Sequence, residues 1–417
     1  MPEHPSAARP VNEAASAARL SPRPTGKLAL LAVSIAFGLV AFLALDWLRS
    51  AAIRRSWTGM SHFSCGISDP IRYTAFKSNC VSTMAWGPYP FEFATNSLGL
   101  RDEKVREVPL ADSRPRILML GNSFTQSEGT WQESYVGRIA AHFPQYDFLN
   151  GGVMGYSPSN YLNTARILLA KGVEIDEVIV FVGVSDVFDE AASYQDVGDS
   201  GAVTPVRKPS EPRHGLHYWY EKHYVYLANQ FMLTHALVEM IERFLVAHGH
   251  YSVTASRPDL PVFDADPHAW TYRAINPIAW APLGVDGGIA KAEARMTALW
   301  QELGRRNIPI SVVVYPYVPQ LIHDTVDSRQ VRLWRDWCAG KCKRFISVFP
   351  EFFAVKDQCP RFQPGCWYLK LFIFGDMHYS AAGNALVADA VIQSLAQDPP
   401  AKRPEEDLSP DSRAGAH

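Results

Sequence analysis

The stretch RILMLGNS, residues 116–123, decides the fold of this chain. Residues 117–120 are apolar, the run ends at Gly121, and the small polar pair Asn122 and Ser123 follows. A short apolar run that ends in this way is typical of a buried parallel strand, which delivers the side chains after it to the carboxyl edge of a sheet. Ligands bind at that edge in open α/β sheets. Ser123 is therefore predicted to lie where a ligand can reach it.

Strands and helices alternate on the carboxyl-terminal side of this stretch. The patterns predict strands at 116–120, 146–150, 177–183 and 310–315, and helices near 133–143, 158–171, 224–247, 289–305 and 381–395. The strand at 177–183 is almost entirely apolar, as expected of a strand buried on both faces. This alternation predicts an α/β fold with three layers, in which helices cover both faces of a mostly parallel sheet.

The chain has 417 residues, of which 47% are hydrophobic and 20% are charged, so a large core is expected. We predict a cytoplasmic tail at 1–27, a transmembrane helix at 28–48, a lead-in segment at 49–112 and the α/β domain at 113–395. The alternation lapses at about 190–287, which reads as an insertion, and 396–417 has the composition of a disordered tail. The net charge of −2 argues against a nucleic-acid partner.

Residues 28–48 are apolar except for Ser34 and Asp46. At about 1.5 Å per residue, this helix just spans the hydrocarbon layer of a bilayer. A cleaved signal peptide is the alternative, but no small-x-small cleavage site follows the apolar stretch. Basic residues flank the segment on both sides, so their distribution does not decide its orientation.

The cysteines indicate the orientation instead, because all six follow the apolar segment. An even number of cysteines is typical of disulfides in an exported domain. The simplest pairing joins neighbours, as Cys65–Cys80, Cys338–Cys342 and Cys359–Cys366. We therefore expect a single-pass protein of the inner (cytoplasmic) membrane with a periplasmic or otherwise extracytoplasmic body.

A second motif, GDMHYSAAGN at residues 375–384, leads into the last predicted helix. In a loop, side chains two residues apart can share one edge, so Asp376 can accept the imidazole N–H of His378. The other ring nitrogen would then face Ser123, which gives a nucleophile, a base and an orienting carboxylate. The structural alternative is that Ser123 and Asp376 cap helices and that His378 lies on the surface. The motif lacks the second glycine of a Gly-x-Ser-x-Gly elbow.

Four motifs together resemble the SGNH, or GDSL-type, hydrolase family. Residues 121–123 resemble its first block, with Asn122 in place of the usual Asp, and residues 150–156 resemble the second. Residues 183–186 resemble the third block, residues 376–378 resemble the last, and residues 96–102 are similar to lead-ins of exported bacterial members. The resemblance implies a flavodoxin-like SGNH hydrolase fold and a serine esterase or acyltransferase. It implies catalytic Ser123, Asp376 and His378, and an oxyanion hole with Gly155 and Ser185.

Ser185 departs from the family pattern, since an asparagine normally donates to the oxyanion there. The loss of one such donor costs on the order of 10²–10³ in rate. Either Ser185 replaces it, the insertion supplies another donor, or the enzyme is slow. We expect no cofactor and no metal, because Asp186 and Asp189 read as caps and the histidines at 248 and 250 as a solvated helix end.

Three functions are compatible with these patterns. The first is a membrane-anchored extracytoplasmic ester hydrolase that removes acetyl groups from a cell-envelope or exported glycan. The second is an O-acyltransferase that acetylates such a glycan with the same triad. The third is a degenerate protein that binds glycan or scaffolds the cell-envelope polysaccharide machinery. The expected partners are an acylated glycan or another ester, and the membrane through the N-terminal helix.

Overall fold

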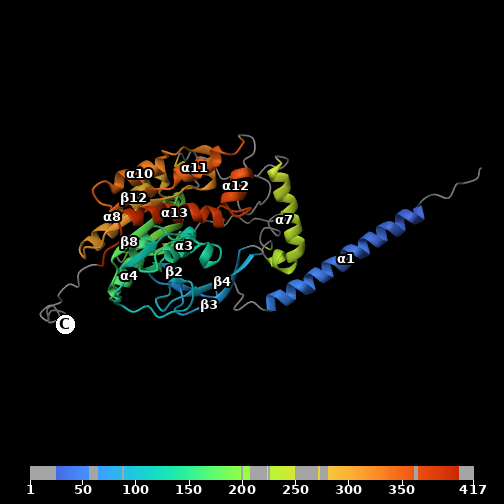
Figure 1. The fold of residues 1–417 in the computed structure, drawn as a ribbon, viewed down its shortest axis with the longest axis horizontal. Coiled ribbons are helices and arrows are strands. Elements are labelled where there is room, and N and C mark those ends of the chain that lie inside the picture. The colour runs from blue at the N-terminus through green and yellow to red at the C-terminus, as the bar shows by residue number, and fades with distance from the viewer. Residues whose placement is uncertain are drawn as a thin grey trace, which may run out of the picture.

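The computed structural model describes residues 25–55, 64–86, 89–198, 201–206, 223, 226–248, 271–272, 280–360 and 365–402 (Figure 1). Its centre is an eight-stranded sheet in the order β12-β11-β8-β6-β7-β5-β4-β3. The strands are β3 (Val81–Trp86), β4 (Tyr89–Thr95), β5 (Arg101–Asp102), β6 (Arg116–Leu120), β7 (Asp147–Asn150), β8 (Glu177–Val182), β11 (Ile310–Val314) and β12 (Arg344–Ser347).

The five strands β7, β6, β8, β11 and β12 pair in parallel. If these five strands are numbered 1 to 5 along the chain, their order across the sheet is 2-1-3-4-5, which is the flavodoxin-like arrangement. In this arrangement the direction in which successive strands are added reverses between strands 1 and 3. That switch point lies between β6 and β8, where Met119 pairs with Ile179. The predicted α/β fold with a mostly parallel sheet is confirmed, and β6 has the predicted bounds.

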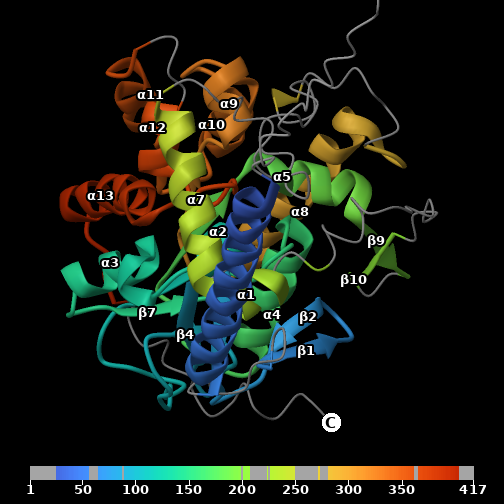
Figure 2. The ribbon, with the colours of Figure 1, turned by 90° about the vertical axis from the view of Figure 1, so that its right-hand side faces the viewer.

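Helices cover both faces of the sheet, with α3 and α13 on one side and α4 and α8 on the other (Figure 2). The helices of the body are α2 (Ser123–Gln126), α3 (Tyr135–His142), α4 (Pro158–Ala170), α5 (Val184–Phe188), α7 (Met232–Ala247), α8 (Gly284–Gly304), α9 (Val318–His323), α10 (Arg329–Cys338), α11 (Phe349–Asp357), α12 (Gly365–Leu371) and α13 (Ala381–Gln397). A 3₁₀ turn, η1, spans Trp131–Glu133, and a π-helical turn, η2, spans Asp189–Ser193. The helices predicted between residues 133 and 395 are present with shifted ends.

The lead-in segment 49–112 supplies part of the central sheet. Its strands β3, β4 and β5 extend the sheet beyond β7 by antiparallel pairing, and Arg101 is opposite Asn150. A separate hairpin joins β1 (Gly66–Asp69) and β2 (Tyr73–Phe76). The domain that begins at residue 113 in the sequence-based division is therefore continuous with this segment in the structure.

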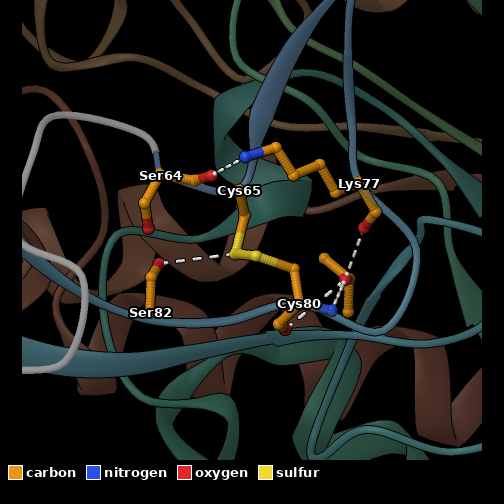
Figure 3. The surroundings of a disulfide bond; sticks show 6 residues. Ser64, Cys65, Lys77, Cys80 and Ser82 are labelled. Carbon is orange, nitrogen blue, oxygen red and sulfur yellow. Dashed lines mark hydrogen bonds between the residues drawn. A yellow bond between two sulfur atoms is a disulfide. The ribbon is translucent and has the colours of Figure 1, made fainter.

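Three disulfides are present, and they are the pairs proposed from the spacing: Cys65–Cys80, Cys338–Cys342 and Cys359–Cys366. The first ties the start of β1 to the start of β3 (Figure 3). Beside it, Lys77 Nζ donates a hydrogen bond of 2.8 Å to the carbonyl of Ser64, and the Ser82 hydroxyl lies 3.5 Å from Cys65 Sγ. This disulfide therefore joins the β1–β2 hairpin to β3, the edge strand of the central sheet.

The helix α1 (Thr25–Arg55) contains the predicted transmembrane segment 28–48. Its most apolar window has a mean hydropathy of 2.7, and among the described residues it is the helix that is long and apolar enough to cross a membrane. Residues 1–24 of the predicted cytoplasmic tail lie outside the described residues.

The insertion at 190–287 is described in part. Its hairpin of β9 (Tyr194–Val197) and β10 (Ala202–Pro205) follows η2, and α7 lies further along. Residues 207–222, 249–270 and 273–279 lie outside the described residues. At the other end of the chain, α13 ends at Gln397 and Lys402 Nζ donates to Glu174, so the start of the predicted tail contacts the body, whereas 403–417 lie outside the description.

Candidate active site

The carboxyl ends of β6, β7 and β8 bring three of the predicted blocks to one edge of the sheet. Ser123 is the first residue of α2, and the helix follows directly after β6. Asn122 caps this helix, because its side-chain oxygen accepts a hydrogen bond of 3.0 Å from the N–H of Phe124. Since Asn122 is the cap, the side chain of Ser123 is left available for other contacts.

Ser123, His378 and Asp376 form one hydrogen-bonded chain. His378 Nε2 lies 2.8 Å from Ser123 Oγ, and His378 Nδ1 lies 2.7 Å from Asp376 Oδ1. The same carboxylate oxygen accepts the backbone N–H of His378 at 2.9 Å. A carboxylate held in this way fixes both the ring orientation and the tautomer of the imidazole, with the proton on Nδ1 and the lone pair of Nε2 facing the serine.

The surroundings of His378 suit a general base. Burial acts to lower the pKa of His378, but the charge of Asp376, its hydrogen bond and the charge of Glu128 outweigh this effect, so the pKa is raised. Phe124 packs against the imidazole with ring centroids 4.7 Å apart, and only 12% of the His378 side chain is exposed. The ring is therefore held in place on two sides.

The loop that carries Asp376 and His378 is braced at both ends. The Tyr368 hydroxyl accepts the N–H of Asp376 at 3.0 Å and also lies 3.1 Å from its carbonyl oxygen. Ser380 is the cap of α13, since its hydroxyl accepts the N–H groups of Ala382 and Gly383. Asp376 does not cap this helix and His378 is largely buried, so the structural alternative raised for these two residues is not what the structure contains.

Gly155 lies in the loop after β7, the predicted second block. It adopts a φ of +76°, which favours glycine, and within the described residues its N–H makes no hydrogen bond. Gly152 in the same loop is also required, because a Cβ there would lie 2.5 Å from the backbone nitrogen of Gln126. The loop thus packs directly on α2, the helix that begins with Ser123.

Ser185, from the third block, lies in a network of hydroxyl and amide groups. Its hydroxyl oxygen is 2.7 Å from the Tyr317 hydroxyl, and Asn122 Nδ2 donates to it at 3.2 Å. Tyr315 in turn donates to Asn122 Oδ1 at 2.9 Å. If Tyr317 is the donor in its pair with Ser185, the hydrogen of Ser185 is free to point at a ligand. The position of Tyr317 directly after a strand places it near the carboxyl edge, but its contact with Ser185 depends on the fold and has no signal in the sequence.

Asp186 has a structural role beneath this network. It is fully buried and accepts hydrogen bonds from the Tyr161 hydroxyl and the Gly183 N–H. Burial raises the pKa of Asp186 well above its usual range, despite the hydrogen bonds from Tyr161 and Gly183. Among the described residues, no group of three His, Cys, Asp or Glu side chains has the arrangement of a metal site.

Glu128 is a buried carboxylate that the sequence patterns do not reveal. It is 6% exposed, and its two carboxylate oxygens are buried and have no hydrogen-bond partner among the described residues. Burial raises the pKa of Glu128 to about 7. The charges of His378 and Arg101 act to lower this pKa, and the charge of Asp376 acts to raise it. Its charge state is therefore coupled to that of His378 and Asp376.

Arg101 holds the loop that contains Glu128. Its guanidinium, which is buried, donates to the carbonyl oxygens of Gln126, Ser127 and Gly129. Ser127 has a φ of +69°, a strained conformation for a residue with a side chain, so the loop needs such external contacts. Arg101 belongs to the 96–102 motif, which therefore supports the segment directly after the α2 helix.

A cavity of about 280 Å³ opens beside this loop. It is lined by residues from the α2–η1 loop, from α7 and from the segment after His378, among them Glu128, Thr130, Glu133, Arg243, Tyr379 and Ser380. Its walls combine aromatic, hydroxyl and charged groups. The aromatic side chains of Trp280, Tyr315 and Tyr317 are buried in the core and are not among the residues that line this cavity.

Comparison with known proteins gives the following similarities. No protein-family model matches the sequence, and no curated protein matches it. A lipolytic G-D-S-L family protein from Veillonella parvula is similar in structure at 10% identity, with 68% of this chain and 98% of that chain covered and a TM-score of 0.34. The esterase EstA from Pseudoalteromonas sp. is similar at 11% identity, with 68% and 97% covered and a TM-score of 0.35.

A GDSL-like lipase from Bacteroides thetaiotaomicron is also similar, at 10% identity, with 70% and 92% covered and a TM-score of 0.35. The Veillonella and Bacteroides structures carry the G-D-S-L name, which is that of the family the four sequence blocks resemble. Identities and scores at this level carry no argument about activity, so the function below is argued from the geometry of the site.

Proposed function

We propose that this protein is a membrane-anchored, extracytoplasmic SGNH-type serine ester hydrolase that works through an acyl-serine. The observation that carries the proposal is the hydrogen-bonded chain from Ser123 through His378 to Asp376, with distances of 2.8 Å and 2.7 Å. A serine activated by an oriented imidazole is the arrangement that nucleophilic acyl transfer requires.

The reaction begins when Ser123 Oγ attacks the ester carbonyl while His378 Nε2 takes its proton. Asp376 accepts the Nδ1–H of His378 and stabilises the imidazolium that forms. His378 then gives the proton to the leaving alkoxide oxygen as the ester C–O bond breaks, which leaves an acyl-serine. Water attacks this acyl group with His378 as base, and collapse of the second tetrahedral intermediate returns the proton to Ser123 and releases the acid.

The negative charge on the carbonyl oxygen needs fixed donors during both attacks. We assign this role to the backbone N–H groups of Ser123 and Gly155 and to the hydroxyl of Ser185. Support comes from the open N–H of Gly155 in its φ +76° conformation and from the contacts that orient Ser185. Asn122 and Tyr317 act as positioning residues, because they contact Ser185 rather than the reacting atoms.

Replacement of Ser185 by alanine tests this assignment. If Ser185 donates to the oxyanion, kcat should fall on the order of 10²–10³-fold with little change in KM. Tyr317→Phe should produce a smaller fall of the same kind, since it removes only the hydroxyl that orients Ser185. Initial rates on a small acetate ester would measure both.

Ser193→Ala is the matched control for this pair, because its half-buried hydroxyl bonds to Asp189 outside the proposed oxyanion hole. Its kcat should stay within a few-fold of the wild type. A Ser185→Ala enzyme as active as this control would show that Ser185 is not an oxyanion donor.

Replacement of Glu128 by glutamine should move the pH profile of activity. Negative charge on Glu128 favours the protonated form of His378 and helps to raise the His378 pKa. Since the base must be neutral, loss of that charge should lower the pKa of His378 and shift the acid limb of kcat/KM to lower pH. Rates between about pH 5 and 9 would measure the shift.

Two further measurements distinguish a specific effect of Glu128 on His378 from a general effect of removing a negative charge near the site. Glu133→Gln, at an exposed residue that lines the same cavity, should leave the acid limb in place. Because the pKa of Glu128 is raised from 4.5 to about 7, its contribution to wild-type stability falls as pH rises from about 4.5 to about 7, and Glu128→Gln should remove that fall. An unchanged acid limb in Glu128→Gln would contradict the coupling to His378.

The location and the substrate complete the proposal. The apolar α1 supports a membrane anchor, and three disulfides support an oxidising compartment outside the cytoplasm. We place 1–27 in the cytoplasm, 28–48 across the inner membrane and 113–395 as the catalytic domain. In this compartment an acetylated cell-envelope or exported glycan is the proposed substrate, and O-acyl transfer to such a glycan is the second candidate.

The acyl acceptor can be measured directly. The full-length protein in detergent micelles would be given p-nitrophenyl acetate with and without a soluble oligosaccharide, and separately an O-acetylated oligosaccharide. Hydrolysis predicts free acetate from both esters, unaffected by the added sugar. Acetylated oligosaccharide formed at the expense of free acetate would establish transfer instead. Folded protein that gives neither product would contradict both enzyme proposals.

A further inference from the structure

One face of α7 exposes a stripe of large apolar side chains. Leu237, Met240, Ile241 and Phe244 are 40%, 59%, 56% and 59% exposed, and Leu233 begins the stripe one turn earlier at 38%. These positions repeat at three or four residues, so they lie along a single side of the helix. Contiguous exposed apolar surface of this kind marks a contact with another protein or with a membrane.

The opposite face of α7 is fixed on the body. Glu239 and Val246 are buried there, and a Cβ on Gly365 of α12 would come within 2.7 Å of Val246. The Arg243 guanidinium lies over the ring of Phe374, 5.0 Å from its centroid. The apolar stripe is therefore held facing outward and is not free to turn toward the core.

The amino-terminal end of α7 is joined to the carboxyl-terminal part of α1. Asp46 accepts the N–H groups of Leu233 at 3.0 Å and of Thr234 at 2.7 Å, and Ser50 accepts the N–H of Met232 at 3.1 Å. Asp46 and Ser50 are 2% and 0% exposed, so the contact is closed to water. The residue that ends the apolar segment of α1 thus satisfies the first N–H groups of α7.

The arrangement of the two helices places the stripe on the side of the body from which α1 departs. In Figure 1, α7 lies between the sheet layers and α1, and Figure 2 looks at the same side of the body with α1 in front of α7. Because Asp46 stands at the end of the apolar segment, the start of α7 lies at the level where that segment leaves the bilayer.

We propose that α7 rests on the bilayer that α1 spans, with the stripe Leu233, Leu237, Met240, Ile241 and Phe244 inserted at the boundary between headgroups and acyl chains. The proposal rests on the membrane anchor of the proposed function. A lipid surface fits because the stripe is continuous with the apolar α1 through the Asp46 junction, and because amphipathic helices bind membranes by such a face. Arg243 of α7 also lines the cavity beside the His378 loop. Binding of α7 to the membrane would therefore hold the proposed active site close to the bilayer.

Photolabelling from within the bilayer tests this seat on the unmodified protein. The full-length chain would be reconstituted in vesicles of phosphatidylethanolamine and phosphatidylglycerol that contain a membrane-partitioning trifluoromethylphenyl diazirine. After irradiation, mass spectrometry would locate the adducts. Label is expected on α1 and on Met240, Ile241 and Phe244, at least tenfold above Leu110. Leu110 is the control because it is 51% exposed but lies beside Glu174, before β8, at the opposite edge of the sheet.

The outcomes separate the two levels of the proposal. If α1 is labelled but the stripe carries no more label than Leu110, α7 does not rest on the bilayer. That result would overturn the inference and leave the membrane anchor intact. An unlabelled stripe in a protein that light scattering shows to be dimeric in detergent would assign the stripe to a second copy and also overturn the proposal. If α1 itself stays unlabelled, the membrane anchor fails and the inference fails with it, while ester hydrolysis by the same sample would still stand.

Discussion

Ser123→Ala is expected to lower kcat for ester hydrolysis by about 10⁶-fold, the scale of losing the nucleophile of a serine triad. The reason is that no other nucleophile is assigned to the site, so acylation stops and only binding and oxyanion stabilisation remain. The change should leave the fold intact, because Asn122 caps α2 and the Ser123 hydroxyl is bonded to His378 rather than to the backbone. Steady-state rates and the melting temperature would be measured together.

Ser193→Ala again provides the control for a serine hydroxyl lost outside the triad. It should retain both activity and melting temperature within a few-fold and a few degrees. A Ser123→Ala protein that keeps more than about one hundredth of wild-type activity would contradict an acyl-serine mechanism.

Asp376→Asn is expected to lower kcat by about 10⁴-fold, the second largest effect. The amide nearly preserves the shape of the carboxylate, but its NH₂ group cannot accept the Nδ1–H of His378. If the amide oxygen keeps the contact, the imidazolium still loses its neighbouring charge. If the NH₂ group faces the ring, the wrong tautomer puts an N–H toward Ser123. The loss should appear in kcat more than in KM.

Asp376 is fully buried, so the fold of this variant needs its own check. Circular dichroism and thermal unfolding should show a folded protein, because Tyr368 still binds the backbone of residue 376. Asp389→Asn, in the outer part of α13, is the matched change and should retain activity. A folded Asp376→Asn enzyme within tenfold of the wild type would remove Asp376 from the triad.

Much of the central fold follows from local pattern. The run at 116–120 and the apolar segments after it are buried on both faces, and their short length and the polar or glycine residues that end them separate them from helices. The loop at 375–384 is similarly readable, because a short sequence separation puts Asp376 and His378 within contact of each other. Local signals of this kind do not depend on what packs against them.

The parts that sequence could not provide depend on tertiary contacts. The lead-in strand β5 has two residues and pairs with β7, which lies far along the chain, so no local pattern identifies it as part of the sheet. Glu128 reads as a surface residue, and its burial depends on tertiary contacts, among them the hydrogen bonds by which Arg101 holds its loop. The apolar stripe of α7 reads as a core face until the body is seen to pack on the other side.

Fluorophosphonate labelling is the sharpest test of the acyl-serine mechanism, because an activated serine attacks this reagent much faster than an ordinary serine does and keeps a stable adduct. The full-length, disulfide-intact protein would be labelled, digested and analysed by mass spectrometry, with His378→Ala as the control. An adduct on Ser123 is expected in the wild type and should be lost in the control. Folded protein that forms no adduct on Ser123, or forms it equally without His378, would contradict the account.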